Sequence, residues 1–298
     1  MDNYRERMTN VLDEVLEVAR DARRVVVLTG AGISAESGLA TFRDPEDGLW
    51  NRYDPMQLAS IDAWDEDPEM VWAWYLWRFE RHHQVEPNAG HRALADWEEG
   101  ADVLVVTQNV DDLHERGGSS DVVHLHGNLS AFRCSDCERP YTDRVDVPHE
   151  PVERLAPPSC PACGGLVRPG VVWFGEMLPP DAFDRAVEEV QSADLVLTVG
   201  TSGIVAPASL LPRFAGARGV PVIEINPNPT EHSDEVTHVW RAPAASALPA
   251  LVQAIRATGA RLPDAVDEWA YAADESFRLI RGCRRCNPRR GSSSRRTD

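Results

Sequence analysis

The sequence predicts an α/β protein, in which a parallel sheet carries helices on both faces and a smaller domain is inserted into it. Three observations support this fold class. Short, continuously apolar runs recur along the chain, as expected for strands that are buried on both faces. Segments with helical spacing of apolar residues alternate with these runs. Two stretches, 42–90 and 131–168, interrupt the alternation.

The elements can be placed in chain order from these patterns. A first helix is expected over residues 3–21, where Val11, Leu12, Val15, Leu16 and Ala19 share one apolar face. Strands are expected at 24–29, 102–107, 122–125, 194–199 and 220–225. A Trp-rich helix should begin at Pro68, with Asp67 as its N-cap. Residues 131–168 are rich in Cys, Pro and Gly, and they show no helical or strand periodicity long enough for a core.

Composition limits the possible ligands. Among 298 residues, 48 acidic against 30 basic side chains give a net charge of −18, which repels nucleic acid and acidic membranes. We find neither an apolar run of membrane-spanning length nor a signal-peptide core, so we expect a soluble cytoplasmic monomer that binds neither membrane nor nucleic acid. The chain contains no Lys.

A glycine-rich turn follows the first predicted strand. Gly30-x-Gly32-x-x-Ala35 has the spacing that lets a backbone approach a pyrophosphate, and it should open a helix. The acidic residue usually found about 20 positions later has no clear counterpart. By itself the motif is compatible with either a dinucleotide site or a plain tight turn.

Two Cys-x-x-Cys pairs, at Cys134/Cys137 and Cys160/Cys163, are separated by 22 residues. This spacing is close to that of a zinc ribbon, and four thiolates leave no open position on the metal. We therefore expect a structural zinc, the alternatives being buried free thiols or disulfides. The pair Cys283/Cys286 has no second pair near it, and we interpret it as exposed thiols.

Six motifs occur in order between residues 30 and 227. They are GAGISAESGLATFR (30–43), TQNVDDLH (107–114), HLHG (124–127), GVVWFGE (170–176), GTS (200–202) and INP (225–227). The set closely resembles the signatures of the sirtuins, NAD-dependent protein deacylases with a Rossmann-like domain. The resemblance implies that NAD is bound by Gly30, Ala31, Gly32, Ala35, Phe42, Arg43, Gln108, Asn109, Asp111, Gly200, Thr201, Ser202 and Asn226.

The interruptions of the strand–helix pattern and the change of composition near the end predict a domain division. Residues 1–41, 91–130 and 169–261 would form the Rossmann-like NAD-binding domain. Residues 42–90 and 131–168 would form the small domain, a helical module with the zinc ribbon. Residues 262–298 would be an Arg-rich, disordered extension. The sequence departs from the family at Arg241-Ala242-Pro243-Ala244, where Gly is often found near the adenine, so we assign no contact there.

His126 matches the catalytic base of the family. A single His near a strand end is more often a hydrogen-bonding group, but imidazole titrates near neutral pH and can take a proton from a ribose hydroxyl. The implied reaction transfers the acyl group of acyl-lysine to the ribose and releases nicotinamide and an acyl-ADP-ribose. Asn109 would order the ribose or a water, Asp111 the nicotinamide amide, and Phe42 would shield the reactive centre.

Tyr75 and Arg78 lie three positions apart on the Trp-rich helix and can converge on one anion. Such a pair is usually a surface feature, but this segment resembles the desuccinylase and demalonylase (class III) branch of the sirtuins. We expect succinyl- or malonyl-lysine to be favoured, with acetyl-lysine also accepted.

Residues 171–176 form an extended apolar piece that could pair with the substrate backbone through Val171, Val172 and Phe174, or could be an ordinary buried strand. The substrate must be another molecule, because this chain has no Lys.

Two other functions remain open at this stage. Mono-ADP-ribosyl transfer would use the same NAD pocket without needing Tyr75 and Arg78. A zinc-ribbon binding module without enzymatic activity could contact nucleic acid through the Arg-rich tail, although the acidic body disfavours it.

Overall fold

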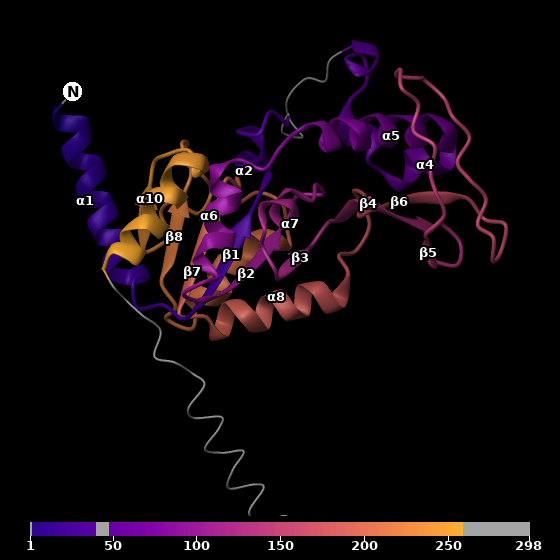
Figure 1. Cartoon of the computed structure of the whole chain (residues 1–298). Coiled ribbons are helices and arrows are strands. Elements are labelled where there is room, and N and C mark those ends of the chain that lie inside the picture. The colour runs from indigo at the N-terminus through magenta and orange to yellow at the C-terminus, as the bar shows by residue number, and fades with distance from the viewer. Residues whose placement is uncertain (1, 40–47, 259–298) are drawn as a thin grey trace, which may run out of the picture. The chain divides into compact units, whose positions relative to one another are not determined.

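The computed structural model describes residues 2–39 and 48–258, and all of its elements belong to one compact unit, residues 1–260 (Figure 1). The expectations for Phe42, Arg43 and the extension with its Cys283/Cys286 pair lie outside the described residues. In the described part of the chain, no helix is long and apolar enough to cross a membrane.

Six parallel strands form the main sheet in the order β3-β2-β1-β7-β8-β9. Their bounds are β1 Arg24–Thr29, β2 Asp102–Thr107, β3 Val122–His124, β7 Leu195–Val199, β8 Val222–Ile225 and β9 His238–Trp240. Five of these strands confirm the sequence prediction. The three-residue β9 was missed, because its run is too short to stand out.

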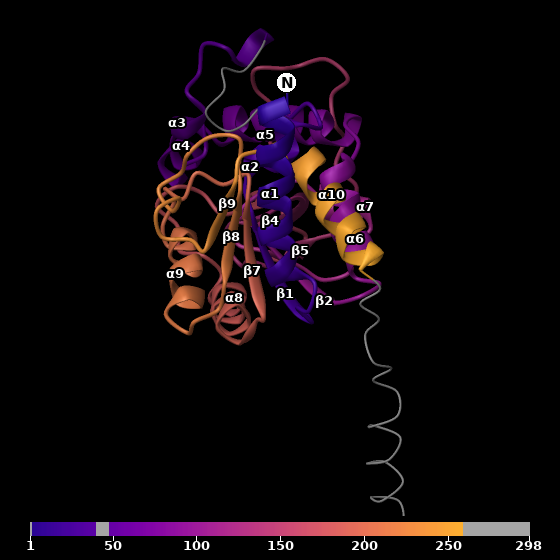
Figure 2. The same ribbon diagram turned by 90° about the vertical axis from the view of Figure 1, so that its left-hand side faces the viewer.

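Helices cover both faces of this sheet (Figure 2). Val25 and Val27 pack into the core beneath α1 (Asp2–Ala19), α6 (Ala89–Trp97) and α10 (Ala244–Ala257). Val26 and Leu28 pack into the opposite core, beneath α8 (Pro180–Ser192) and α9 (Leu211–Gly216). Successive side chains of a strand point to opposite faces, so a continuously apolar strand is what this layered arrangement requires.

A third core is built around tryptophans. It includes Trp50, Trp72, Trp74 and Trp173, all at most 2% exposed. The helices in this region are α3 Pro55–Leu58, α4 Ile61–Glu66 and α5 Pro68–Gln84, preceded by the 3-10 turn Gly48–Trp50. Asp67 caps α5 as predicted, because its side chain accepts a hydrogen bond from the backbone N–H of Met70 at 3.1 Å.

Residues 131–168 show no long periodicity, yet short strands reach into both ends of this stretch. A three-stranded sheet, in the order β5-β4-β6, is formed by β4 Gly127–Cys134, β5 Pro140–Tyr141 and β6 Val167–Val171. The register of β4 against β6 shifts between Gly127 and Phe132, which breaks the regular alternation that reveals a strand in a sequence. Val167 and Val171 pack into the Trp-rich core.

These strands bear on the proposed domain division. β4 runs through residues 130 and 131, and β6 runs through residues 168 and 169, so hydrogen-bonded strands cross both positions. The domain boundaries stay a prediction.

Candidate active site

The carboxyl ends of β1, β2, β7 and β8 lie at one edge of the main sheet. The strand order reverses direction between β1 and β7, and open α/β sheets bind ligands in the crevice at such a switch point. Gly30 follows β1, Gln108 follows β2, Gly200 follows β7 and Asn226 follows β8. The topology therefore brings together four segments that the sequence predicts to bind NAD.

The glycines at this edge hold two loops in close contact. Gly30 donates its N–H to Val199 O at 3.1 Å, and Gly32 donates to Gly200 O at 2.8 Å. A Cβ on Gly32 would lie 2.6 Å from Gly200 O, and Gly200 itself has a φ of +61°. The glycines are thus required for the packing of the β1–α2 loop against the loop after β7, where α2 is Ala31–Ala35.

Amide and hydroxyl groups connect the same loops. Asn109 donates its side-chain N–H groups to Gly30 O at 3.2 Å and to Ser34 Oγ at 3.0 Å. Gln108 donates to Thr201 Oγ1 at 3.1 Å, and Asn226 donates to Thr201 O at 3.0 Å. Ser34 was not among the predicted site residues, although it lies within the glycine-rich motif.

This arrangement fits a bound dinucleotide. Close backbone approach at the glycines and a row of hydroxyl and amide groups across the switch point are what ribose and phosphate groups need. Ala31 and Ala35 begin and end α2, and Ser202 lies in the loop after β7.

His126 lies between the sheet edge and the segment predicted to bind substrate. Its Nδ1 lies 3.0 Å from Gln108 O, and its own carbonyl accepts from the N–H of Val172 at 2.8 Å. Because a carbonyl oxygen can only accept, Nδ1 carries the proton, and the neutral ring keeps its lone pair on Nε2. Burial lowers the pKa of His126 below its ordinary value despite the bond to Gln108, so the ring is neutral at pH 7.

Asp111 and His124 interact electrostatically with each other. Asp111 is 6% exposed and accepts from the N–H of Leu113 at 3.2 Å, and burial raises the pKa of its carboxyl group. Burial alone would lower the pKa of His124. Its hydrogen bonds to Glu115 at 2.7 Å and to Asn109 O at 3.1 Å outweigh burial and raise that pKa. Sequence reasoning missed Glu115, because a lone Glu nine positions from a His carries no signal.

The predicted substrate segment continues from the small sheet. Val171 pairs with Gly127 at the end of β6, and Phe174 donates its backbone N–H to Ala59 O at 2.9 Å. Phe174 is 42% exposed. The segment is extended as far as Phe174, whose side chain is presented at the surface, and then turns, because Glu176 donates its N–H to Trp173 O at 3.0 Å. Its pairing with substrate stays a prediction.

Tyr75 and Arg78 are both on α5, and both lie against the Trp74 ring, whose centre is 4.6 Å from that of Tyr75. The Tyr75 hydroxyl accepts a hydrogen bond from Trp173 Nε1 at 3.0 Å, whereas the Arg78 guanidinium lies 5.0 Å from the centre of the Trp74 ring. Burial raises the pKa of Tyr75, and the positive charge of Arg78 partly offsets this rise. Arg78 is thus close enough to act electrostatically on the Tyr75 hydroxyl.

The four predicted metal ligands come together. The Sγ atoms of Cys134, Cys137, Cys160 and Cys163 all lie within 4.8 Å of one another. The Sγ atoms of Cys134 and Cys163 are 3.4 Å apart, and those of Cys137 and Cys160 are 3.8 Å apart. These distances are close to the S–S separation of about 3.8 Å around a tetrahedral zinc with Zn–S bonds of ~2.3 Å. None of the four is in a disulfide.

Backbone groups prepare this cluster for a metal. The N–H groups of Cys137 and Asp136 donate to Cys134 Sγ at 3.5 and 3.4 Å, and they lower the pKa of that thiol to about 7. A soft, closed set of four sulfur donors fits Zn²⁺ in a structural role.

Arg241, in the segment that the sequence left unassigned, forms an ion pair with the buried Glu224. Arg241 donates to the carboxylate of Glu224, which is 1% exposed at the end of β8, and to Asn228 O at 3.0 Å. Glu224 also accepts from Thr230 and Ser233. The pair fixes the loop that begins at Asn226. No spacing rule predicts it, since Glu224 lies in β8 and Arg241 follows β9.

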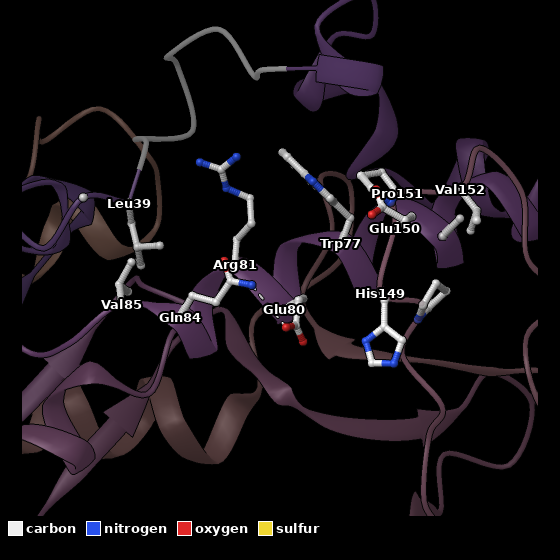
Figure 3. A pocket seen from close by; sticks show the side chains of 13 residues that line it. Leu39, Trp77, Glu80, Arg81, Gln84, Val85, His149, Glu150, Pro151 and Val152 are labelled. Carbon is white, nitrogen blue, oxygen red and sulfur yellow. Dashed lines mark hydrogen bonds between the residues drawn. The ribbon is translucent and has the colours of Figure 1, made fainter.

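A pocket of about 360 Å³ lies on the other side of α5 (Figure 3). Ala73, Trp77 and Gln84 line it from the helix, opposite a segment with His149 and Glu150. Tyr75 is two positions from Ala73, or about 200° around the helix, so it faces away from this pocket. None of the residues predicted to bind NAD, acyl-lysine or zinc is among those that line the pocket, and we assign it no role in the reaction.

The fold and the site together define an α/β nucleotide-binding protein with a four-cysteine metal module. The model of the Sir2 family matches residues 30–207, and the chain belongs to this family. An NAD-dependent protein deacylase of Corynebacterium glutamicum is 54% identical over 250 residues, which cover 83% of this chain and 96% of the relative.

Solved structures agree with this assignment. A Sir2 homologue in complex with NAD is 44% identical and superposes with a TM-score of 0.75, covering 83% of this chain and 94% of its own. A variant Sir2 homologue in complex with 2′-O-acetyl-ADP-ribose is also 44% identical, with a TM-score of 0.75, and covers 83% of this chain and 97% of its own.

Proposed function

We propose that this protein is an NAD-dependent protein-lysine deacylase that acts on other proteins. The observation that carries the proposal is the position of His126. Its ring is hydrogen-bonded to Gln108 O at the polar edge of the main sheet, and its backbone carbonyl is hydrogen-bonded to Val172 in the predicted substrate segment. A base in this position can serve a nucleotide on one side and an acylated side chain on the other. Relatives named as NAD-dependent protein deacylases support this proposal.

The chemistry assigned to His126 is that of a general base. When bound, NAD supplies a ribose with a good leaving group, nicotinamide, and a 2′-hydroxyl that can receive the acyl group. His126 takes a proton from a ribose hydroxyl at Nε2, the atom that its bond to Gln108 leaves unprotonated. The depressed pKa keeps this nitrogen ready to accept a proton at neutral pH.

Neighbouring residues orient the reactants. Asn109 is fixed by bonds to Gly30 and Ser34, and we assign to it the ordering of the ribose or of a water. Asp111, buried and held by Leu113, is assigned the nicotinamide amide. Such positioning is the main contribution that a protein makes when the cofactor carries the reactive group.

The four-cysteine cluster is proposed to hold a structural Zn²⁺. Cys134 ends β4, and the other three ligands follow it in turns, so a metal here would tie β4 to the chain that returns as β6. β6 leads directly into Val172 and the bond to His126. Zinc would therefore act through the position of the substrate segment.

The acyl group is proposed to be acidic, succinyl or malonyl, with acetyl also accepted. A carboxylate at the end of the acyl chain would pair with the Arg78 guanidinium and accept a hydrogen bond from the Tyr75 hydroxyl. The electrostatic coupling of these two side chains supports a shared anion.

A panel of peptides bearing acetyl-, malonyl- and succinyl-lysine, incubated with NAD, tests the proposal. Arg78→Met should lower kcat/KM for succinyl-lysine by ~10- to 100-fold, the value of one charged hydrogen bond, and leave acetyl-lysine nearly unchanged. Arg81→Met is the matched control. Arg81 also lies over a tryptophan ring on α5, 5.1 Å from the centre of Trp77, but it lines the opposite pocket. Equal losses for both peptides would contradict the acidic-acyl assignment.

A further inference from the structure

Trp173 joins the substrate segment to the acyl-binding helix. Its indole N–H donates to the Tyr75 hydroxyl at 3.0 Å, with the two ring centres 6.2 Å apart. Trp173 is 2% exposed and Tyr75 5% exposed, so this bond is shielded from water. A buried hydrogen bond between two aromatic side chains fixes both rings and the direction of the hydroxyl group.

The indole is itself held on several sides. The guanidinium of Arg168 lies 3.4 Å from the centre of the Trp173 ring, a close cation–π contact. Glu176 binds that guanidinium with both oxygens, at 2.6 and 2.9 Å, and accepts the backbone N–H of Trp173 at 2.8 Å. Trp64 packs beside the same ring at 5.4 Å. Backbone and side chain of Trp173 are thus both fixed.

The direction of the Trp173–Tyr75 bond follows from its chemistry. An indole N–H can only donate, so the Tyr75 oxygen is the acceptor and its own proton must point elsewhere. Within the residues that the structure describes, that proton has no acceptor. Burial raises the pKa of Tyr75, so the hydroxyl stays protonated. Tyr75 is thereby held as a hydrogen-bond donor.

The donor is placed relative to the catalytic base by two consecutive residues. Val172 donates its backbone N–H to His126 O at 2.8 Å, and the next residue, Trp173, reaches Tyr75. The position of the Tyr75 hydroxyl is therefore fixed relative to His126, the residue that we place at the reacting ribose. The distance between base and hydroxyl donor sets which acyl chain can reach from one to the other.

We propose that Trp173 is a specificity-determining positioning residue, which orients the Tyr75 hydroxyl to donate to the carboxylate of an acidic acyl group. This inference rests on the proposed deacylase function. Arg168 and Glu176 act through Trp173 and keep its N–H directed at Tyr75.

Trp173→Phe tests this role, because it removes the N–H and keeps an aromatic ring beneath Arg168. We expect kcat/KM for succinyl-lysine to fall by roughly 10-fold, mainly through KM, and kcat/KM for acetyl-lysine to change less than about twofold. Trp64→Phe is the matched control: it alters a ring that packs against Trp173 without bonding to Tyr75, and should leave the succinyl-to-acetyl ratio unchanged.

A double-mutant cycle separates positioning from a general loss of packing. In a Tyr75→Phe background, Trp173→Phe should have no further effect on the succinyl-to-acetyl ratio, because the hydroxyl that it orients is already gone. An equal fall in both activities, or an additive effect in the double variant, would overturn the inference. A wild-type protein that removes acetyl but not acidic acyl groups would overturn it and leave the deacylase function standing. A wild-type protein with no NAD-dependent deacylation would overturn both.

Discussion

Replacing Cys160 by Ser should abolish zinc binding and loosen the small sheet. Cys160 is 6% exposed, and its Sγ lies 3.8 Å from that of Cys137. A hydroxyl is a much poorer zinc ligand than a thiolate, and three remaining sulfurs do not close the tetrahedron. Structural zinc sites contribute ~10–16 kcal/mol in small peptides, comparable with the whole stability of a typical domain.

The loss in the free energy of unfolding of the whole protein should be smaller, because only the small sheet depends on the metal. Cys134 and Val167 are paired between β4 and β6, and both are fully buried. Exposing two side chains of this size costs roughly 3 kcal/mol. At ~2–4 °C per kcal/mol for a protein of this size, the melting temperature should fall by about 6 to 12 °C.

Zinc content by mass spectrometry and thermal unfolding by tryptophan fluorescence measure these two effects. The matched control is the double variant Cys283→Ser, Cys286→Ser, which removes the other Cys-x-x-Cys pair of the sequence. It should keep one zinc per chain and an unchanged melting temperature. One zinc per chain in Cys160→Ser, or an unchanged melting temperature, would refute the reasoning.

Three further predictions concern the nucleotide edge. Because the pKa of His126 is depressed and the neutral ring is the active form, kcat/KM should fall only as pH drops through a value below 6.5; a limb centred above 6.5 would contradict this. In urea unfolding, Gly200→Ala should cost ~2–4 kcal/mol, because it combines a left-handed φ with a clash. Gly219→Ala is the control, because Gly219 also has a positive φ, +79°, but an added Cβ there would meet open space; it should lower the free energy of unfolding by only ~1–2 kcal/mol. Equal losses of stability in the two variants would be evidence against the close packing of the loop at Gly200. Arg241→Ala should cost ~3–5 kcal/mol and raise the KM for NAD, because it leaves the Glu224 carboxylate buried and unpaired; an unchanged KM would separate this pair from the NAD site.

Much of the fold was predictable because its strands are buried on both faces. A run such as Val25–Leu28 must supply one core with Val25 and Val27 and the other with Val26 and Leu28. Such a run is apolar throughout and easy to find. β4 was not found, because its register shift against β6 breaks the alternation on which a strand prediction depends.

The site divides in the same way. The four cysteines were found by spacing, because their ligand pairs are local in sequence and a tetrahedral sulfur site needs little else. The hydrogen bond between Trp173 and Tyr75 joins residues 98 positions apart in the sequence, and the ion pair of Glu224 and Arg241 joins residues 17 positions apart. Partners that tertiary packing alone brings together leave no periodic signal, so the structure was needed to find them.

The most direct test of the proposed function follows nicotinamide release and peptide deacylation together, with NAD and an acyl-lysine peptide, in wild type and in His126→Ala. The proposal predicts that both products appear in step and depend on the acyl group. It also predicts that His126→Ala lowers the rate of deacylation by ~10²- to 10⁴-fold while the variant stays folded. Undiminished deacylation by His126→Ala, or nicotinamide release that does not depend on the acyl peptide, would contradict it.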